Sequence, residues 1–597
     1  MGAGRKTGLL VLAGVAVAAV LAAPARAAEF HLDCSAAVSG DGSANNPFNG
    51  LAGTFTLGPG DRLLLRRGSS CSGQLKVTGG GSDTQPVEVA TYGSGAKPAI
   101  VGTGTNAVLL EDTSNLTVRD LDISNPGSAG PLGEGSQIRN GIKAVAQTGS
   151  VRNLTLTGLS IHDVDGDLTK NPQGSAAIQA SVTGPTPVRF ENLRITGNEI
   201  RSVSRSGISI TGTNDSSRPS ADQPWPNAST GVVVEGNRID LIAGDGIVPR
   251  GTDGAIVQAN VVSRGNIAGR PLNDPGGPMC NAGIWTFRSN NTVIRGNEVF
   301  GMKFNGCDGT GFDVDYRQDG TVIEGNYSHH NEGGFMLLCT DNETHRADVR
   351  FNLSVDDAAM ISHGPCGIAD GVIGDLSGIR MFNNTVVGAT PAVSMLLGPV
   401  SEMFEPGDFT FVNNLIYARQ PFTAIPCGNN CAGNGFFNLP PSGSDPLTGN
   451  PLLEGPLLSS EGLGVAEGFR LAENSPLRGA GLAVADPGEA DYFGNPLPKK
   501  LSVGFDQSPG PEGPSTACLK ARKARSDAWR KVRKMNSRLG KLRRRHAGPA
   551  EIRTARRKLR HARSAARRKA RAARRACGPA SASLAREEAG RPGAGSA

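Results

Sequence analysis

Two aspartates, Asp313 and Asp315, are the residues of this sequence whose type and spacing most directly suggest chemistry. They lie in the short run Gly311-Phe-Asp-Val-Asp315. Side chains alternate along a β-strand, so we expect both carboxylates on one face, about 6–7 Å apart. Such a pair can cleave a glycosidic bond, because one acid protonates the leaving oxygen while the other activates water or attacks the sugar. Crowding of like charges raises one pKa of such a pair, which gives the required asymmetry.

Further polar and aromatic residues gather near this pair. We assign catalytic roles to Asp313, Asp315, Lys303, His329 and Glu332, and substrate binding to Arg250, Trp285, Phe287 and His330. The same polar stretch contains Asp308. A sugar ring stacks well on an aromatic face such as that of Trp285. A lyase would use the cluster differently, with Ca²⁺ or another cation on the carboxylates and Lys303, Arg250 or a histidine as the base. Hydrolase and lyase therefore both stay open, and the sequence specifies no metal.

Each of these residues also has an interpretation without chemistry. An outward aspartate on an exposed strand can simply keep the surface soluble, or bind Ca²⁺ between coils. A histidine in a turn, such as His329 or His330, is more often a loop residue than a catalyst. Trp285 can be a rim residue packed under a loop.

The strands that must position these residues repeat along the chain. Five glycine-led segments alternate with period 2: Gly207-Ile-Ser-Ile, Gly246-Ile-Val-Pro, Gly283-Ile-Trp-Thr, Gly311-Phe-Asp-Val and Gly334-Phe-Met-Leu. Aligning them predicts one set of inward side chains: Ile208, Ile210, Ile284, Thr286, Phe312, Val314, Phe335 and Leu337. The alternate residues should point outward: Ser209, Val248, Arg250, Trp285, Phe287, Asp313, Asp315, Met336 and Leu338.

A second column of asparagines runs in step with the glycines. It consists of Asn198, Asn237, Asn260, Asn297, Asn326, Asn352, Asn384 and Asn414, at intervals of 39, 23, 37, 29, 26, 32 and 30 residues. Stacked asparagines can bond amide to amide from coil to coil, so the pattern predicts a parallel β-helix with a polar ladder. Glycosylation is the alternative for Asn326-Tyr-Ser and Asn342-Glu-Thr. A β-sandwich is the structural rival, but it would not produce both columns in order.

Residues 115–506, about two thirds of the chain, resemble the right-handed parallel β-helix proteins of the pectate-lyase-like superfamily. The closing segments Ser475-Pro-Leu-Arg-Gly-Ala-Gly481, Asp491-Tyr-Phe-Gly-Asn495 and Gly504-Phe-Asp506 are similar to the way many secreted members end. The resemblance implies a mainly β solenoid that acts on extracellular polysaccharide, with lyases, glycoside hydrolases and non-catalytic members all represented. The polygalacturonase pattern of Asn-Thr-Asp, Asp-Asp and Gly-His-Gly is absent.

The amino terminus predicts export. Arg5 and Lys6 precede an apolar run of 15 residues, from Leu9 to Ala23, and Ala25-Arg-Ala27 follows as a cleavage site. A membrane anchor would need about 20 apolar residues, so we expect a secreted, extracellular or surface-associated protein with no transmembrane segment. Outside the cytoplasm disulfides persist. The ten cysteines leave their connectivity open, but four spacings suggest the pairs Cys34–Cys71, Cys280–Cys307, Cys339–Cys366 and Cys427–Cys431. A zinc site at Cys427 and Cys431 is not expected, because no second cysteine pair or histidine cluster follows.

The charges of the chain are segregated. Residues 516–577 hold 25 Lys/Arg and 2 acids, a balance of +23, whereas the remainder holds 36 basic and 52 acidic residues, a balance of −16. Apolar residues recur there at steps of three and four on either side of Gly548-Pro549, which predicts a helical hairpin closed by Cys518 and Cys577. Dense cationic charge binds polyanions. For a secreted protein we expect an anionic envelope polymer or acidic glycan rather than nucleic acid. The alternative is a solvated helix pair that aids solubility.

Together these features predict six parts. They are a signal peptide (1–27), an N-terminal cap with the first coils (28–110), a parallel β-helix (111–506), a linker (507–515), a basic helical hairpin (516–578) and a disordered tail (579–597). The function we expect is that of a secreted, monomeric, polysaccharide-active enzyme, hydrolase or lyase, working in a groove on the β-helix face. The alternative is a non-catalytic carbohydrate-binding or surface-attachment protein. Only a lyase would call for Ca²⁺.

Overall fold

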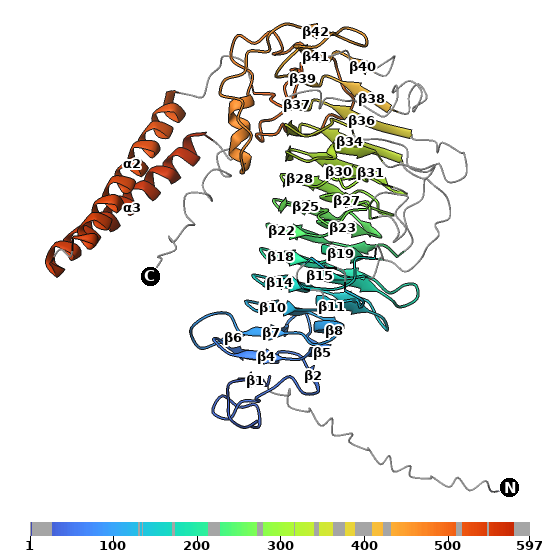
Figure 1. Ribbon diagram of the computed structural model, residues 1–597, viewed down its shortest axis with the longest axis vertical. Helices are drawn as coiled ribbons and strands as arrows, with labels where there is room; N and C mark the ends of the chain where they lie inside the picture. Colours follow the sequence, from blue (N-terminus) through green and yellow to red (C-terminus); the bar gives the residue numbers. More distant parts are fainter. Residues whose placement is uncertain are drawn as a thin grey trace.

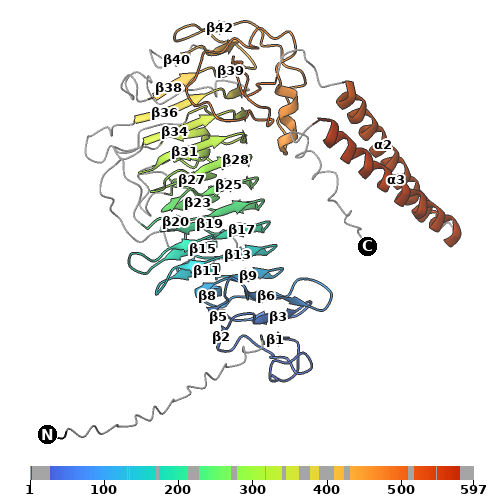
Figure 2. The same ribbon diagram turned by 180° about the vertical axis from the view of Figure 1, so that it is seen from behind.

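A computed structural model describes residues 2, 27–128, 130, 132–133, 135–169, 174–212, 227–270, 279–315, 317–338, 345–361, 377–388, 409–421, 431–508, 516–545 and 548–577. Short strands stack into a long solenoid, and two helices lie to one side of it near its carboxyl-terminal end (Figures 1 and 2). Every pairing between the named strands is parallel and joins one coil to the next, for example Val293 to Val322. The predicted mainly β, parallel β-helix class with a helical extension is confirmed.

Three long sheets form the walls of the solenoid: the first and second continue to its carboxyl-terminal end, and the described strands of the third end at Leu338. Between Arg62 and Leu338 the chain passes from the first sheet to the second and then to the third in each turn. The first sheet is formed, in spatial order, by β1 (Glu29–Leu32), β3 (Arg62–Arg66), β6 (Val87–Tyr92), β9 (Leu116–Arg119), β13 (Leu154–Thr157), β17 (Arg194–Thr196), β21 (Val233–Glu235), β25 (Ile256–Gln258), β28 (Val293–Arg295), β31 (Asp319–Glu324), β34 (His345–Arg350), β36 (Ser377–Phe382), β38 (Phe409–Val412) and β40 (Cys431–Ala432).

The second sheet is formed by β4 (Ser70–Ser72), β7 (Ala99–Val101), β10 (Asp122–Asn125), β14 (Ser160–Val164), β18 (Glu199–Val203), β22 (Arg238–Ile242), β26 (Val261–Ser263), β29 (Glu298–Phe300), β32 (Tyr327–His329), β35 (Leu353–Val355), β37 (Thr385–Gly388), β39 (Leu415–Ala418), β41 (Gly435–Phe437) and β42 (Leu447–Thr448).

The third sheet is formed by β2 (Thr54–Leu57), β5 (Leu75–Gly80), β8 (Asn106–Ser114), β11 (Asn140–Ala146), β15 (Ala176–Val182), β19 (Ser206–Thr211), β23 (Ile247–Arg250), β27 (Ile284–Thr286), β30 (Thr310–Val314) and β33 (Gly334–Leu338). A short fourth sheet contains β12 (Val151–Arg152), β16 (Phe190–Glu191), β20 (Ser229–Thr230) and β24 (Thr252–Asp253).

The asparagine column forms the predicted ladder, at the corner between the first and second sheets. From Asn198 to Asn414 the side-chain amide of each asparagine donates to the carbonyl oxygen of the next, at 2.8–3.1 Å, and Asn434 adds a further rung. Each also bonds backbone groups; Asn297 Nδ2, for instance, donates to Val257 O at 2.9 Å. Asn326 is fully buried in this ladder. Glycosylation of Asn326 is therefore excluded, while Asn342 lies outside the described residues.

The glycine column lets successive coils approach closely at the start of the third-sheet strands. A Cβ on Gly207 would lie 2.7 Å from Gly246 O, and one on Gly283 would lie 2.6 Å from Gly311 O. Side chains on the inner side of the same strands, such as Ile284, Phe312 and Val314, are fully buried in the core. Stacking of backbone at the glycines and of apolar side chains beside them thus fixes which residues face outward.

Two of the predicted disulfides are described: Cys34–Cys71, near the amino-terminal end of the solenoid, and Cys280–Cys307. Cys431 is disulfide-bonded, and its predicted partner, Cys427, lies outside the described residues. Cys339 and Cys366 also lie outside them, as do the side chains of Cys518 and Cys577.

The segment after the last coil folds back against the second sheet. It includes the 3₁₀ helix η3 (Leu463–Phe469), and its Phe469 and Phe505 pack on Tyr327 and Leu353. The backbone N–H of Gly462 donates to Glu298 Oε1 at 2.7 Å. The returning segment therefore covers the second sheet at β29, β32 and β35.

Helices α2 (Thr516–Arg544) and α3 (Pro549–Cys577) form the predicted hairpin, with Pro549 opening the second helix as expected. Val532 and Leu539 of α2 pack on Leu559 and Ala566 of α3. The seam thus follows the three-and-four periodicity seen in the sequence. None of the helices in the described ranges is long and apolar enough to cross a membrane.

Candidate functional site

Asp313 lies on the outward face of the third sheet, as predicted. Its strand, β30, pairs with β27 so that Asp313 stands opposite Trp285. Asp313 and Asp315 are only 3% and 8% exposed, although they point away from the core. The carboxylates therefore occupy a largely desolvated outer surface, where interactions with a charged or polar ligand are strong.

The predicted orientation is wrong for the coil that follows. Phe312 pairs with Met336 and Val314 with Leu338, so Met336 and Leu338 share the inner side and Leu337 stands opposite Asp313. Gly334 pairs with Thr310, and Phe335 therefore takes the place that Gly311 holds one coil earlier. Two successive glycines, Gly333 and Gly334, shift the glycine signature by one residue, and a shift of one residue reverses every side chain.

Arg250 and Phe287 occupy the next outward-facing position after Trp285, and a parallel bridge joins them. The Arg250 guanidinium lies over the Phe287 ring, 4.6 Å from its centroid. Burial, assisted by repulsion from Arg288, lowers the pKa of Arg250 to about 10, and attraction to Asp315 opposes the decrease. Arg250 thus remains a cation at neutral pH and lies within electrostatic range of Asp315.

Trp285 is held by a buried ion pair that the sequence did not reveal. Its indole Nε1 donates to Asp245 Oδ1 at 2.9 Å, and Asp245 Oδ2 accepts from Arg205 at 2.7 Å. Both charged side chains are almost fully buried. Trp285 itself is 7% exposed, which favours packing over broad stacking on a sugar. Their place in the sequence could have indicated this pair, because Arg205 and Asp245 lie just before Gly207 and Gly246 of the glycine column and should therefore lie in adjacent coils.

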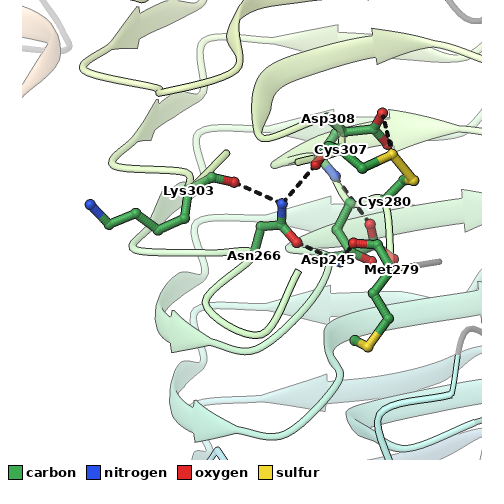
Figure 3. Close-up of a disulfide and its surroundings, with 9 residues drawn as sticks. Asp245, Asn266, Met279, Cys280, Lys303, Cys307 and Asp308 are labelled. Atoms are coloured by element: carbon green, nitrogen blue, oxygen red, sulfur yellow. Dashed lines mark hydrogen bonds between the residues drawn. A yellow bond between two sulfur atoms is a disulfide. The ribbon is translucent and has the colours of Figure 1, made fainter. Parts of the chain in front are cut away.

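Asp308 is a third carboxylate of this region, and our assignment gave it no role. It lies in the loop between β29 and β30, is 8% exposed, and forms a parallel bridge with Asn281. Its Oδ1 lies 3.6 Å from Cys307 Sγ of the Cys280–Cys307 disulfide (Figure 3). The run from Asp308 to Asp315 thus supplies three largely buried carboxylates in eight residues.

Lys303 and Glu332 are paired with each other. Lys303 Nζ forms an ion pair with Glu332 Oε1, and both side chains are 48% exposed. The hydrogen bond from Lys303 lowers the pKa of Glu332. In Figure 3 the Lys303 side chain points away from the disulfide and Asp308. The predicted grouping of Lys303 and Glu332 with the aspartates is thus not seen.

His329 and His330 belong to the second sheet and its following turn, not to the sheet of the aspartates. His329 is buried between the rings of Phe300 and Tyr327, and its Nε2 lies 3.1 Å from Glu298 Oε1. His330 Nε2 lies 3.3 Å from Ser459 Oγ of the returning segment. The structure therefore places the histidines and the aspartates on different sheets, because the chain turns a corner between β32 and β33.

The described residues contain one group of three potential metal ligands within 4.8 Å of one another: Cys280, Cys307 and Asp308. Both sulfurs are joined in the disulfide, and a metal binds the thiolate form of cysteine. This group does not fit a metal ion, so Ca²⁺ stays a prediction tied to a lyase.

The basic hairpin offers a second candidate surface. Lys531, Lys534, Arg556, Arg557 and Arg560 are among its exposed cations. The apolar side chains of α2 and α3 pack against each other between the two helices. Its outer surface is therefore strongly cationic on both helices.

Comparison with known proteins places this geometry in a broader context. Residues 188–368 match the family described as "Right handed beta helix region". The protein is a right-handed parallel β-helix. A lacto-N-biosidase of Bifidobacterium longum subsp. longum is 27% identical over 443 residues, and the match covers 60% of this chain and 27% of the relative. The β-helix protein thus spans about a quarter of the length of that curated relative.

Solved structures agree on the fold. Two crystal structures of a GH136 lacto-N-biosidase from Eubacterium ramulus, a selenomethionine derivative and the native protein, are 24% and 23% identical to this β-helix, with TM-scores of 0.55 and 0.54. They cover 66% and 65% of this chain and 68% of the solved chain in each case. At this level of identity the likeness establishes the fold.

Proposed function

We propose that this protein is a secreted glycosidase whose reaction takes place on the outward face of β30. The observation that carries the proposal is the set of three largely buried carboxylates, Asp308, Asp313 and Asp315, beside Trp285 and Arg250. Similarity to lacto-N-biosidases supports cleavage of a glycosidic bond and favours an oligosaccharide substrate.

Two of the three carboxyl groups would carry the reaction. One carboxylic acid donates its proton to the glycosidic oxygen as the bond to the anomeric carbon breaks, and the other, as a carboxylate, attacks that carbon or takes a proton from water. Asp308 and Asp315 are each 8% exposed and Asp313 is 3% exposed. Access therefore favours Asp308 and Asp315 as the reacting pair, with Asp315 facing the Arg250 cation as the nucleophile or base.

A lyase is the less favoured enzyme, because it needs a base to remove a proton from the sugar ring. Lys303 forms an ion pair with Glu332, and His329 and His330 lie in the second sheet and in the turn that follows it. The two reactions are separable by product: elimination leaves an unsaturated sugar that absorbs near the ultraviolet edge, and hydrolysis does not.

The test is a glycan panel that includes substrates of lacto-N-biosidases, with Asp308→Asn, Asp313→Asn and Asp315→Asn as variants. We expect the first and third to lose at least about 100-fold in kcat, since removal of an acid or base costs 10²–10⁴. Melting temperatures should stay close to wild type. Asp445→Asn, at an exposed loop position, is the matched control and should retain full activity.

Full activity of Asp315→Asn would show that the reaction lies elsewhere. If the wild-type protein binds a glycan but cleaves none, the alternative function, a non-catalytic carbohydrate-binding protein on the same scaffold, replaces the enzyme.

We also propose that the hairpin of α2 and α3 attaches the secreted protein to an anionic envelope polymer. The supporting observation is the 25 Lys/Arg and 2 acids of residues 516–577, which the apolar seam turns outward. Secretion is supported by the amino-terminal sequence up to Ala27. Amino-terminal sequencing of protein from the culture medium should begin close to Ala28.

A further inference from the structure

The loop of residues 301–309 connects β29 to β30 and ends at the carboxylate proposed above to react. Cys307 of this loop is joined to Cys280, which lies one coil earlier, just before β27. The disulfide therefore ties together the two segments that lead into the strands of Trp285 and Asp313. Asp308 directly follows the cross-link.

Two buried asparagines hold the same loop, and Figure 3 shows one of them, Asn266, next to it. Asn266 Nδ2 donates to Lys303 O at 2.7 Å and to Cys307 O at 3.2 Å. Asn281 Nδ2 in turn donates to Asn266 Oδ1 at 2.6 Å. The backbone N–H of Gly309 donates to Asn281 O at 2.9 Å. The loop is thus fixed at its beginning, at Cys307 and immediately after Asp308.

The backbone at Asp308 requires such fixation. Asp308 has φ of 51° and Gly309 has φ of 80°, so two successive residues occupy the left-handed region. For a residue with a side chain this conformation is uncommon and persists only where the surroundings impose it. A Cβ at position 309 would lie 2.3 Å from Lys303 O, which restricts that position to glycine.

We infer that the Cys280–Cys307 disulfide, with Asn266 and Asn281, is a clamp that positions Asp308, so that breaking the disulfide lowers turnover. The inference rests on the proposed glycosidase function. A dithiol reductant transfers two electrons and two protons to the pair; the S–S bond breaks, two thiols form, and the reductant becomes a disulfide. Asp308 then keeps its chemistry but loses its fixed position.

The effect on rate follows from geometry. A displacement of about 1 Å at a reacting group can cost about 100-fold in rate even when binding persists. Cys280 and Cys307 act through Asp308, and are positioning residues. A disulfide that only stabilised the fold would change the melting temperature and leave kcat unchanged at temperatures where the protein is folded.

The experiment compares Cys280→Ser/Cys307→Ser with Cys34→Ser/Cys71→Ser, a matched control that removes the other described disulfide far from Asp308. For the first variant we expect kcat to fall about 10- to 100-fold, KM to change less than about threefold, and one limb of the pH–kcat profile to move. The control should keep wild-type kcat and pH profile. The inference would be overturned if the Cys280→Ser/Cys307→Ser variant kept the wild-type kcat, or if both variants lost kcat equally.

Two further measurements keep the inference testable. If the serine variant does not fold, native protein in the Cys34→Ser/Cys71→Ser background is reduced with a dithiol, peptide mapping confirms that Cys280 and Cys307 are thiols, and kcat should fall and return on reoxidation. If the wild-type protein cleaves no glycan, the proposed function fails. The clamp is then tested by measuring the hydrogen-exchange rates of backbone amides. Exchange at Gly309 should then accelerate on cleavage of the disulfide while Asn297 of the ladder stays protected; unchanged exchange at Gly309 would refute the clamp.

Discussion

Asp357 is a buried carboxyl group in the turn after β35, and its surroundings favour the neutral form. Burial raises its pKa to about 6, despite hydrogen bonds from the backbone and side chain of Asn331, both 2.9 Å, and from Ser354. The folded protein therefore holds this proton more tightly than the unfolded chain. Stability is lost as pH rises from about 4 to about 6, where the folded state must release it.

Asp357→Asn should remove this loss, because the amide oxygen can still accept from Asn331 and carries no charge. We expect the variant to be more stable than wild type at pH 7, by up to about 3 kcal/mol, and nearly equal to it at pH 4. Thermal or denaturant unfolding at both pH values measures the difference. Asp445→Asn at the surface should show no such pH-dependent gain. A variant that is destabilised equally at both pH values would contradict the argument.

For single residues, the sequence predicted the side of a strand on which a residue lies better than it predicted which other residues lie close to it. Asp313 was placed correctly because alternation along one strand needs no knowledge of the rest of the chain. His329 was misplaced because its relation to Asp313 depends on a corner between two sheets. Asp245 was missed because a turn residue becomes the acceptor of Trp285 Nε1 only when adjacent coils stack.

The asparagine ladder is the element that could be predicted most completely. Each rung needs only that equivalent turns stack, and from Asn198 to Asn414 the observed bonds link residues 23–39 positions apart, as the sequence intervals required. Asn434, 20 positions after Asn414, adds a rung that the sequence analysis did not include. Register is less predictable where a turn changes length. The pair Gly333-Gly334 moved the signature by one residue and reversed the side chains of β33. The rule for one coil therefore transfers to the next only when both turns match.

Asn297→Ala should destabilise the solenoid strongly. The change removes the acceptor of the Asn260 backbone and side-chain amides, and the donor to Val257 O and to Asn326 Oδ1. Each buried polar group left without a partner costs about 1–3 kcal/mol, so we expect a total of at least about 3 kcal/mol. Denaturant unfolding measures it. Asn536→Ala on exposed α2 should cost less than about 0.5 kcal/mol; a similar small cost at Asn297 would mean that the ladder contributes little.

The whole molecule separates its charges between two bodies. Apart from residues 516–577 the chain carries −16, and without Arg5, Lys6 and Arg26 of the predicted signal it carries −19. Helices α2 and α3 pack on each other and project away from the coils in both views (Figures 1 and 2). An acidic body repels anionic polymers, so contact with them falls to the hairpin. The sequence predicts this division because charge composition and helical periodicity both change after the predicted linker, residues 507–515.

Removing residues 516–577 should therefore abolish binding to polyphosphate or to a uronate polymer and leave kcat on a small oligosaccharide unchanged. Replacing exposed Arg556, Arg557, Lys558 and Arg560 by Gln is the milder variant, since it keeps the apolar seam. Cationic binding releases counterions, so the logarithm of the affinity should fall linearly with that of the salt concentration, and less steeply in the Gln variant. Sedimentation with the immobilised polymer across a salt series measures both. Retention in about 1 M salt, where screening reaches only about 3 Å, would show that contacts other than charge hold the protein to its surface.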